Sequence, residues 1–413
     1  MFFFVSLSTS YSSVYPSGLS TSDGVSNYNV SASVKYEVEV NFTFTHTRVT
    51  PQNYYFKVVT LNDRQPSSPI TKDCPPYQES ELYYNSITGD DALIKGKLDK
   101  FNNTYDLFNA TLFQLETITL DRKYNITLNE VSFKDIDYSD IGTYNMSDEI
   151  FDLYCNNSEL YYERDDLSLI SASNSIVDLS DNPIEKAEKI CDWVSNYLTY
   201  DNFLPAQEKG ALWAYNNERG DCSEYSSLMV TLLRIQNIPA RKVTGFCISA
   251  NPSTKPYIGR EWNFYAYKTG STISTNLLGH AWVEYYVENI GWIACDPTWY
   301  SSGYDYFNRI DYLRFNSNIG AWFFLPGASP GYNFISEFPF IPSAVCADHD
   351  AYNFDYQVKV TVLESDVVSS DHPLFPLPFA FIMLIAVSAI IIIVLVTLLL
   401  LLKGKRKKDV SYY

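Results

Sequence analysis

The sequence predicts an α+β protein in which an antiparallel β-sandwich precedes a helix-and-strand domain and one transmembrane helix follows. Three observations predict this order. Apolar and polar residues alternate in short runs up to about residue 133, helical spacing begins at residue 183, and an uncharged apolar run covers residues 379–402. Aromatic residues make up 16% of the 413 residues, which is typical of folded, strand-rich chains rather than disordered ones.

Short alternating runs predict the β-sandwich at residues 29–160. The first strand is expected at residues 33–45, where every second side chain is apolar and one face would be buried. That face consists of Val34, Tyr36, Val38, Val40, Phe42 and Phe44. Asn, Asp and Gly separate further strands expected at residues 54–61, 81–87, 92–98, 113–120 and 125–133. No cluster of reactive side chains accompanies these strands, so we expect a structural or spacer domain.

A helix-and-strand domain is expected at residues 161–304. Asn182 and Pro183 predict a helix start, because Asn is a favoured cap and Pro a favoured first helical residue. Further helices are expected at residues 210–215 and from Cys222 onward. Strands are expected at residues 240–248, 262–268, 280–287, 292–296 and, beyond this domain, 356–363.

The apolar run at residues 379–402 would span roughly 36 Å as a helix, enough to cross a bilayer core of about 30 Å. Basic residues follow it at once, which predicts a cytoplasmic C-terminus and an extracytoplasmic N-terminal bulk in a single-pass membrane protein. The net charge of −18 argues against a nucleic-acid partner. The expected parts are a leader or signal remnant at 1–28, the β-sandwich at 29–160, the helix-and-strand domain at 161–304, a C-terminal extension at 305–373, the transmembrane helix at 374–402 and a cytoplasmic basic tail at 403–413.

Acceptor sequons for N-glycosylation support export, although each is weak by itself. They occur at Asn29, Asn41, Asn102, Asn109, Asn125, Asn145 and Asn156. None follows Asn156, so we expect glycans on the N-terminal domain alone.

The chain has seven cysteines and four histidines. An odd number of cysteines outside the cell indicates one free thiol and up to three disulfides, and six cysteines allow 15 pairings, so no bridge is assigned. We expect Cys222 to be the free thiol. With so few histidines and no phosphate-binding loop, neither a metal nor another cofactor is expected.

Cys222 is expected at the start of a buried helix. Asp221 and Glu224 have the spacing of a capping box, and Asn237 and Pro239 would end the helix. The unpaired N–H groups of the first turn and the helix dipole would favour a thiolate, the nucleophile that acyl transfer needs. A small core residue is the competing interpretation of Cys222.

His280 and Asp296 are expected at the same end of a two-stranded hairpin. If Val287 pairs with Gly291, the two side chains share a face of the sheet, whereas an even-length loop would separate them unless a bulge intervened. Asp296 would then fix the tautomer of the imidazole and stabilise its charged form. Because Pro297 follows, the competing interpretation is that Asp296 only forms a turn.

Four motifs in this order resemble the transglutaminase-like superfamily, in a membrane-anchored microbial or archaeal type. The motifs are Gly220-Asp221-Cys222, Ile238-Pro239-Ala240-Arg241 with Gly245-Phe246, His280-Ala281-Trp282-Val283-Glu284, and Gly291-Trp292 with Asp296-Pro297-Thr298. The resemblance covers about residues 183–300 and implies a papain-like core with Cys222 as nucleophile, His280 as general base and acid, and Asp296 as the orienting group. The superfamily includes protein transglutaminases, thiol peptidases and peptide:N-glycanases. Asn237 departs from the pattern, because a Gly is common at that place.

The sequence therefore predicts a cell-surface thiol enzyme that hydrolyses amide bonds of a peptide, protein or cell-wall substrate through an acyl-thioester on Cys222. Two alternatives stay open: a protein transglutaminase that passes the acyl group to an amine, and a non-catalytic binding protein that retains the fold. The backbone N–H of Cys222 is one expected oxyanion donor, and Tyr200 or Trp213 is expected to supply the second unless both only pack. Trp282 and Trp292 are expected in the core.

Overall fold

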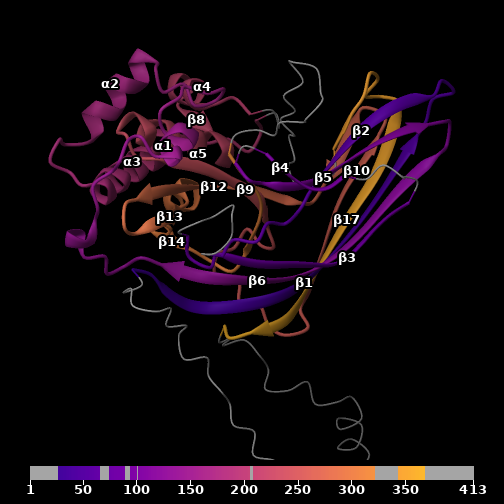
Figure 1. The fold of residues 1–413 in the computed structure, drawn as a ribbon, viewed down its shortest axis with the longest axis horizontal. Helices are drawn as coiled ribbons and strands as arrows, with labels where there is room; N and C mark the ends of the chain where they lie inside the picture. The colour runs from indigo at the N-terminus through magenta and orange to yellow at the C-terminus, as the bar shows by residue number, and fades with distance from the viewer. Residues whose placement is uncertain are drawn as a thin grey trace, which may run out of the picture. The chain divides into compact units, whose positions relative to one another are not determined.

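The chain is described here by a computed structural model that covers residues 27–65, 74–88, 94–99, 101–204, 208–320 and 343–367. These residues belong to one unit, Met1–Val367. The expected transmembrane helix and basic tail lie outside the described residues, as does nearly all of the expected leader. Among the described residues, no helix is both long and apolar enough to cross a membrane. This part of the chain is a mixed α/β structure with a β-rich N-terminal region, as predicted (Figure 1).

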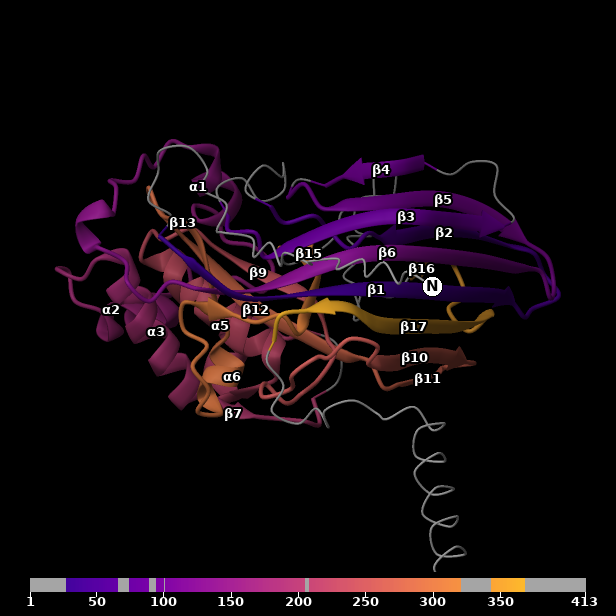
Figure 2. The ribbon, with the colours of Figure 1, turned by 90° about the horizontal axis from the view of Figure 1, so that it is seen from below.

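The longest strands form a seven-stranded antiparallel sheet (Figure 2). In spatial order its strands are β11 (Thr272–Thr275), β10 (Glu261–Thr269), β17 (Tyr352–Ser365), β1 (Asn29–His46), β6 (Thr117–Ser132) and β14 (Arg309–Ile310), with β3 (Gln78–Thr88) also paired with β6. The sheet therefore joins strands from both ends of the described chain. It also takes β10 and β11 from within the expected helix-and-strand domain.

Alternating side chains build the inner face of this sheet. The six apolar residues expected on one face of the first strand, from Val34 to Phe44, are all buried in β1. In β6, buried Leu120, Tyr124 and Ile126 alternate with more exposed polar residues. The sequence predicted two strands, at 113–120 and 125–133, but β6 is continuous. A polar residue at every second position faces outward and does not end the strand.

A second antiparallel sheet covers the first. It consists of β16 (Ser343–Val345), β2 (Gln52–Val59), β5 (Thr104–Leu112) and β4 (Ile94–Leu98). The ring of Phe56 in β2 lies 4.8 Å from that of Phe44 in β1 and 4.5 Å from that of Phe108 in β5, so the two sheets share one apolar cluster. The sequence missed β5, where the buried Asp106 is ion-paired with Arg122 of β6 and does not face solvent.

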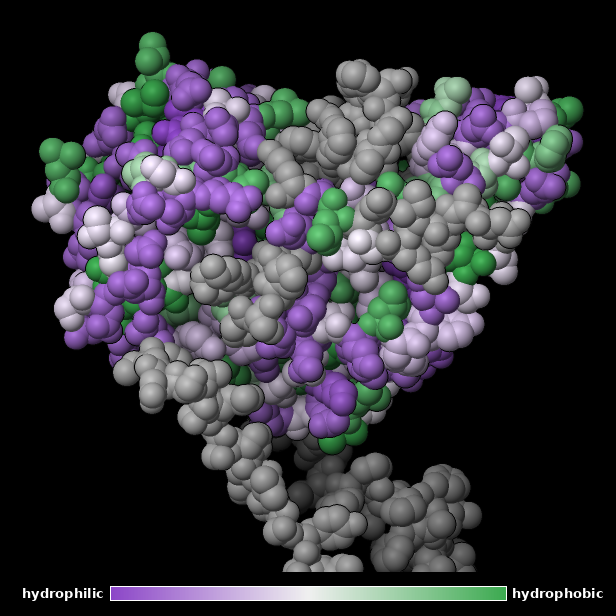
Figure 3. All heavy atoms as spheres, viewed as in Figure 1, coloured by the Kyte–Doolittle hydropathy of each residue, from purple (hydrophilic) through white to green (hydrophobic). Residues whose placement is uncertain are grey.

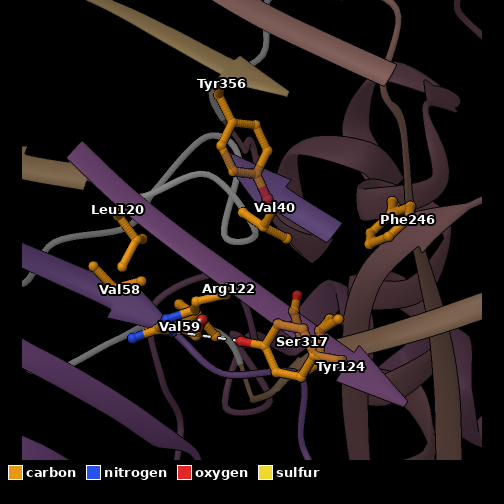
Figure 4. Close-up of a pocket in the computed structure, with 10 residues that line it drawn as sticks. Val40, Val58, Val59, Leu120, Arg122, Tyr124, Phe246, Ser317 and Tyr356 are labelled. Atoms are coloured by element: carbon orange, nitrogen blue, oxygen red, sulfur yellow. Dashed lines mark hydrogen bonds between the residues drawn. The ribbon is translucent and has the colours of Figure 1, made fainter. Parts of the chain in front are cut away.

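A cavity of about 20 Å³ lies within this cluster (Figure 4). Val40, Arg122 and Tyr356 from the large sheet line it together with Phe246 and Ser317. This volume suits about one water molecule and is too small for an organic ligand.

The remaining elements surround a four-stranded antiparallel sheet in the order β13 (Gly291–Cys295), β12 (Leu278–Val287), β9 (Ala240–Cys247) and β15 (Arg314–Ile319). Figure 1 shows the helices gathered around this sheet. The helices are α1 (Glu149–Tyr154), α2 (Leu167–Ile176), α3 (Pro183–Tyr197), α4 (Ala211–Asn217), α5 (Cys222–Ile235) and α6 (Pro297–Ser301), with a 3₁₀ turn η1 (Tyr138–Asp140). A short parallel pair, β7 (Thr199–Tyr200) and β8 (Arg219–Gly220), precedes α5.

Two of these elements bear on the predicted boundaries. α5 is the central helix, because every residue from Glu224 to Arg234 is buried. β15 was not expected from the sequence and lies beyond the predicted boundary at residue 304, yet it pairs with β9. Its polar residues are buried, and Asn316 and Asn318 donate hydrogen bonds to backbone carbonyls.

A buried ion cluster ties the N-terminal region to the helix-and-strand domain. Glu284 of β12 lies within 2.5 Å of Nη2 of Arg64, which comes from the segment between β2 and β3. The same carboxylate lies 2.8 Å from Nη2 of Arg241 in β9, and the Arg241 guanidinium stacks on Trp292 at 3.6 Å. The two regions are therefore joined by charge as well as by apolar packing.

The seven candidate glycosylation asparagines are at least partly accessible. Asn102 and Asn125 are half-buried, and the exposed ones are Asn29, Asn41, Asn109, Asn145 and Asn156. Figure 3 shows polar and apolar residues intermixed over the coloured part of one face. Glycosylation of these sites stays a prediction.

Candidate active site

Cys222 is the first residue of α5, as predicted. The carboxylate of Asp221 accepts a hydrogen bond from the Ser223 N–H at 2.7 Å, and Glu224 accepts one from the Asp221 N–H at 3.1 Å. These two bonds complete the capping box. The helix is followed by Asn237 in the left-handed conformation with φ 59°, also as predicted. Cys222 is partly exposed and so is accessible to a reactant.

The hairpin of β12 and β13 has the register that the site requires. Val287 pairs with Gly291 and Val283 with Cys295, so His280 and Asp296 lie on the same face. Nε2 of His280 lies 2.6 Å from Oδ2 of Asp296. The structure therefore brings together two of the three predicted residues in a direct hydrogen bond.

Asp296 both forms a turn and binds the histidine. Its Oδ1 accepts hydrogen bonds from the N–H groups of Thr298 and Trp299, each at 3.0 Å, and so caps α6. Its Oδ2 accepts from His280. An ionised carboxylate can only accept, so the proton of the neutral imidazole sits on Nε2 and leaves Nδ1 as the basic nitrogen.

Arg314 is a site residue that the sequence analysis missed. Its Nη1 donates to Oδ2 of Asp296, and its Nε lies 3.3 Å from Oδ1 of Asp311. The guanidinium lies 4.0 Å from the ring of Trp299 and 4.4 Å from that of Tyr306, and it is fully buried. The local sequence carries no signal for this contact, because Arg314 lies on a polar strand that was not predicted.

The surroundings of Asp296 keep it ionised. Burial alone would raise the pKa of this carboxyl group, but His280 and Arg314 together hold the pKa well below its usual range. Asp296 therefore carries its negative charge throughout the neutral pH range, as an orienting group for His280 requires.

The thiol of Cys222 differs from the sequence expectation of a stabilised thiolate. Burial raises its pKa well above the ordinary value, and the charge of Asp221 raises it further, while a hydrogen bond from the Ala281 N–H lowers it. The net direction favours the protonated thiol, which is opposite to the effect expected of the helix terminus. Among the described residues, no hydrogen bond joins this thiol to His280. Active sites often form such a bond only when substrate is bound.

Tyr200 and Trp213 are the two residues expected to supply the second oxyanion donor. Tyr200 pairs with Gly220, two residues before Cys222. Burial raises the pKa of its hydroxyl, and the neighbouring acidic groups Cys222 and Asp221 raise it further. Trp213 instead lies against Arg219 at 5.7 Å.

Trp282 and Trp292 are both buried in the core, as the sequence analysis expected.

Six cysteines, Cys155, Cys191, Cys222, Cys247, Cys295 and Cys346, have free thiols in the structure, so none of the up to three disulfides that the sequence allowed is formed. Cys191 of α3 and Cys295 of β13 are nevertheless close, with sulfur atoms 3.3 Å apart. Among the described residues, no group of three or more His, Cys, Asp and Glu side chains is arranged to hold a metal ion.

A cysteine at a helix start beside a His–Asp pair is the arrangement of papain-like thiol enzymes. Residues 170–297 match the family model of the transglutaminase-like superfamily, and this segment is a transglutaminase-like core domain. Members of this superfamily are typically cysteine-based enzymes.

Two curated relatives and one solved structure are similar to parts of this chain. The uncharacterized protein YebA of Bacillus subtilis is 32% identical over 125 residues, which are 29% of this chain and 16% of that protein. A protein-glutamine gamma-glutamyltransferase of Pseudomonas aeruginosa is 33% identical over 86 residues, 21% of this chain and 11% of that protein. The chain thus spans a small part of the length of these relatives. A candidate cysteine protease from Cytophaga hutchinsonii has 15% identity and a TM-score of 0.47, over 83% of this chain and 94% of that one.

Proposed function

We propose that this protein is a cell-surface thiol enzyme that hydrolyses amide bonds through an acyl-thioester on Cys222. The observation that carries the proposal is the 2.6 Å contact between His280 and Asp296, beside the capped helix start that presents Cys222. The helix, the hairpin and the cap of α6 each supply one group, so the arrangement is built by several elements at once.

The first half of the reaction forms the thioester. His280 Nδ1 takes the thiol proton as the Cys222 sulfur bonds to the amide carbon, because burial raises the pKa of this thiol and its attack then needs a base. The carbonyl oxygen receives the electron pair of its double bond. When the carbonyl re-forms, the C–N bond breaks and His280 returns the proton to the leaving nitrogen. Asp296 stabilises the imidazolium between these two steps.

The second half releases the acid. A water molecule gives one proton to His280 as its oxygen bonds to the thioester carbon. The C–S bond then breaks, and the sulfur recovers the proton from His280. The developing oxyanion would be held by the Cys222 N–H and, in this proposal, by the hydroxyl of Tyr200, which pairs through its backbone with Gly220, two residues before Cys222.

Amine transfer is the alternative outcome for the same thioester. The Pseudomonas aeruginosa relative, which is similar over 86 residues, is named a protein-glutamine gamma-glutamyltransferase. The two outcomes can be separated by incubating the protein with a Gln-containing peptide, with and without millimolar cadaverine, and weighing the products. If the deamidated peptide is the main product, the result supports hydrolysis. If the cadaverine adduct dominates, the protein is a transglutaminase and the hydrolase proposal fails.

The nucleophile can be tested directly by trapping. Acid quenching during turnover should leave an acyl group on Cys222, identified by peptide mass. Cys222→Ala should abolish both the adduct and turnover while retaining the fold. Asp296→Asn should lose about 10²–10⁴-fold in rate, since Asn cannot fix the same tautomer. Wild-type turnover by Cys222→Ala would refute the mechanism, because the reaction would then proceed without this thiol.

The cell-surface location is a separate part of the proposal. Its support is the apolar run at residues 379–402 with basic residues after it. External protease on intact cells should remove the region before residue 370. Protection of that region would place the domain on the other side of the membrane.

A further inference from the structure

The Oδ2 atom of Asp296 accepts hydrogen bonds from two donors, and the predicted triad accounts for only His280. We propose that Arg314 is a positioning residue of this site, which fixes the Asp296 carboxylate in place so that Oδ2 orients His280. The inference deepens the proposed function and rests on it for the roles of Cys222 and His280.

Both oxygens of Asp296 are fully engaged. Oδ1 accepts from the N–H groups of Thr298 and Trp299 at 3.0 Å each, and Oδ2 accepts from His280 and Arg314. Four donors on one fully buried carboxylate leave it a single orientation. Without Arg314, His280 would be the only side chain on Oδ2, and the carboxylate would turn more freely about its cap.

Arg314 is itself held by several contacts. Its guanidinium lies 4.0 Å from the ring of Trp299 and 4.4 Å from that of Tyr306, two rings that also pack edge-on against each other at 5.0 Å, and its Nε faces Asp311 at 3.3 Å. The Tyr306 hydroxyl donates to Asp311, and β15 places Arg314 opposite Cys247 in β9. A side chain clamped in this way can transmit its position to the group that it binds.

The nearby Arg309 provides a matched control on the same segment. It too is a cation that contacts the Tyr306 ring, at 5.4 Å, but its ion pair is with Glu130 at 3.0 Å. Arg309→Gln removes a charge and an ion pair without touching Asp296. A general electrostatic or folding effect would appear in both variants, and a positioning effect only in Arg314 variants.

The test uses iodoacetamide on the intact protein, because this probe reports on the Cys222 thiol without a known substrate. The sulfur bonds to the probe's methylene carbon, iodide leaves with the electron pair, and the thiol proton passes to His280. Peptide mass gives the rate at Cys222. At pH 7, Arg314→Gln should slow alkylation about tenfold and Arg314→Lys, which keeps the cation, about threefold. Arg309→Gln should match the wild type.

The same substitutions in an Asp296→Asn background decide whether Arg314 acts through Asp296. There, Arg314→Gln and Arg314→Lys should add no further loss, because the group they position is already gone. As a second readout, ¹⁵N NMR should show His280 as the Nε2–H tautomer in the wild type and as a mixture in Arg314→Gln. With four histidines in the chain, the His280 signals can be assigned by their loss in His280→Asn.

Two results would overturn the inference: a folded Arg314 variant with wild-type alkylation and tautomer, or an equal loss in both backgrounds. If Arg314→Gln does not fold, the alkylation rates of Arg314→Lys in the wild-type and Asp296→Asn backgrounds distinguish the same outcomes. If His280→Asn is alkylated at the wild-type rate, the proposed function fails. If His280→Asn and Asp296→Asn slow alkylation and Arg314 variants do not, only this inference fails.

Discussion

Replacing Glu284 with Gln should strongly destabilise the protein. The carboxylate of Glu284 lies 2.5 Å from Arg64 and 2.9 Å from Nε of Arg241, and all three side chains are at most 1% exposed. Burial alone would raise the pKa of Glu284, but the two arginines lower it, so the group is ionised at neutral pH. Gln keeps the shape and removes the charge, which leaves two buried guanidinium groups facing a neutral amide.

The size of the effect follows from these contacts. Removing one partner of a buried ion pair costs about 3–5 kcal/mol, and a typical domain is stable by only about 5–15 kcal/mol. We expect Glu284→Gln to lower the free energy of unfolding by about 3 kcal/mol, because the Gln carbonyl still accepts one hydrogen bond. The pKa of Glu284 is lowered in the folded state, so its stabilisation is complete at pH 7. The advantage over Gln should shrink as pH falls below about 4.

Urea unfolding followed by tryptophan fluorescence measures this loss. The control is Glu261→Gln, which removes an ion pair with Lys359 of nearly the same length, 2.8 Å, but with both side chains 40% or more exposed. That change should cost less than about 1 kcal/mol. If Glu284→Gln costs no more than Glu261→Gln at pH 7, the buried cluster does not join the two regions as argued.

Three further outcomes follow from the site. Asp221→Asn keeps the helix cap but removes a charge that raises the pKa of Cys222, so iodoacetamide should label Cys222 about tenfold faster at pH 7; unchanged labelling would contradict this. Tyr200→Phe should lower turnover about 10²-fold if its hydroxyl holds the oxyanion, and full activity would assign it to packing alone. Oxidised glutathione should convert Cys191 and Cys295 to one disulfide and release two glutathione thiols, which a non-reducing peptide map would detect.

Features set by neighbouring residues were predicted well from the sequence. The capping box at the start of α5 and the left-handed Asn237 depend on contacts within a few residues. The pairing of Val287 with Gly291 is the one of the two open hairpin registers that brings His280 and Asp296 to one face. These local rules were enough to place Cys222 at a helix start and to bring His280 onto Asp296.

Features set by distant segments were predicted poorly. β15 reads as a polar loop, because its polar groups are satisfied by partners such as Gln78, far away in the sequence. The thiolate expectation used a local property, the helix terminus, whereas the burial that raises the pKa of Cys222 comes from packing of the whole domain. From a single sequence, the reactive residues of a site are easier to predict than the distant segments that pack around them.

If Asp296 orients His280 as proposed, the position of Arg314 links this environment to the reaction. The family match ends at residue 297, directly after Asp296, whereas the cation that binds Asp296 lies on β15. β15 in turn pairs with β9, and Asn316 in β15 accepts and donates hydrogen bonds with Gln78 of the N-terminal region. A change in the β-rich region can therefore reach the orienting carboxylate through one strand. The apparent spacer is then part of what holds the reactive groups in place.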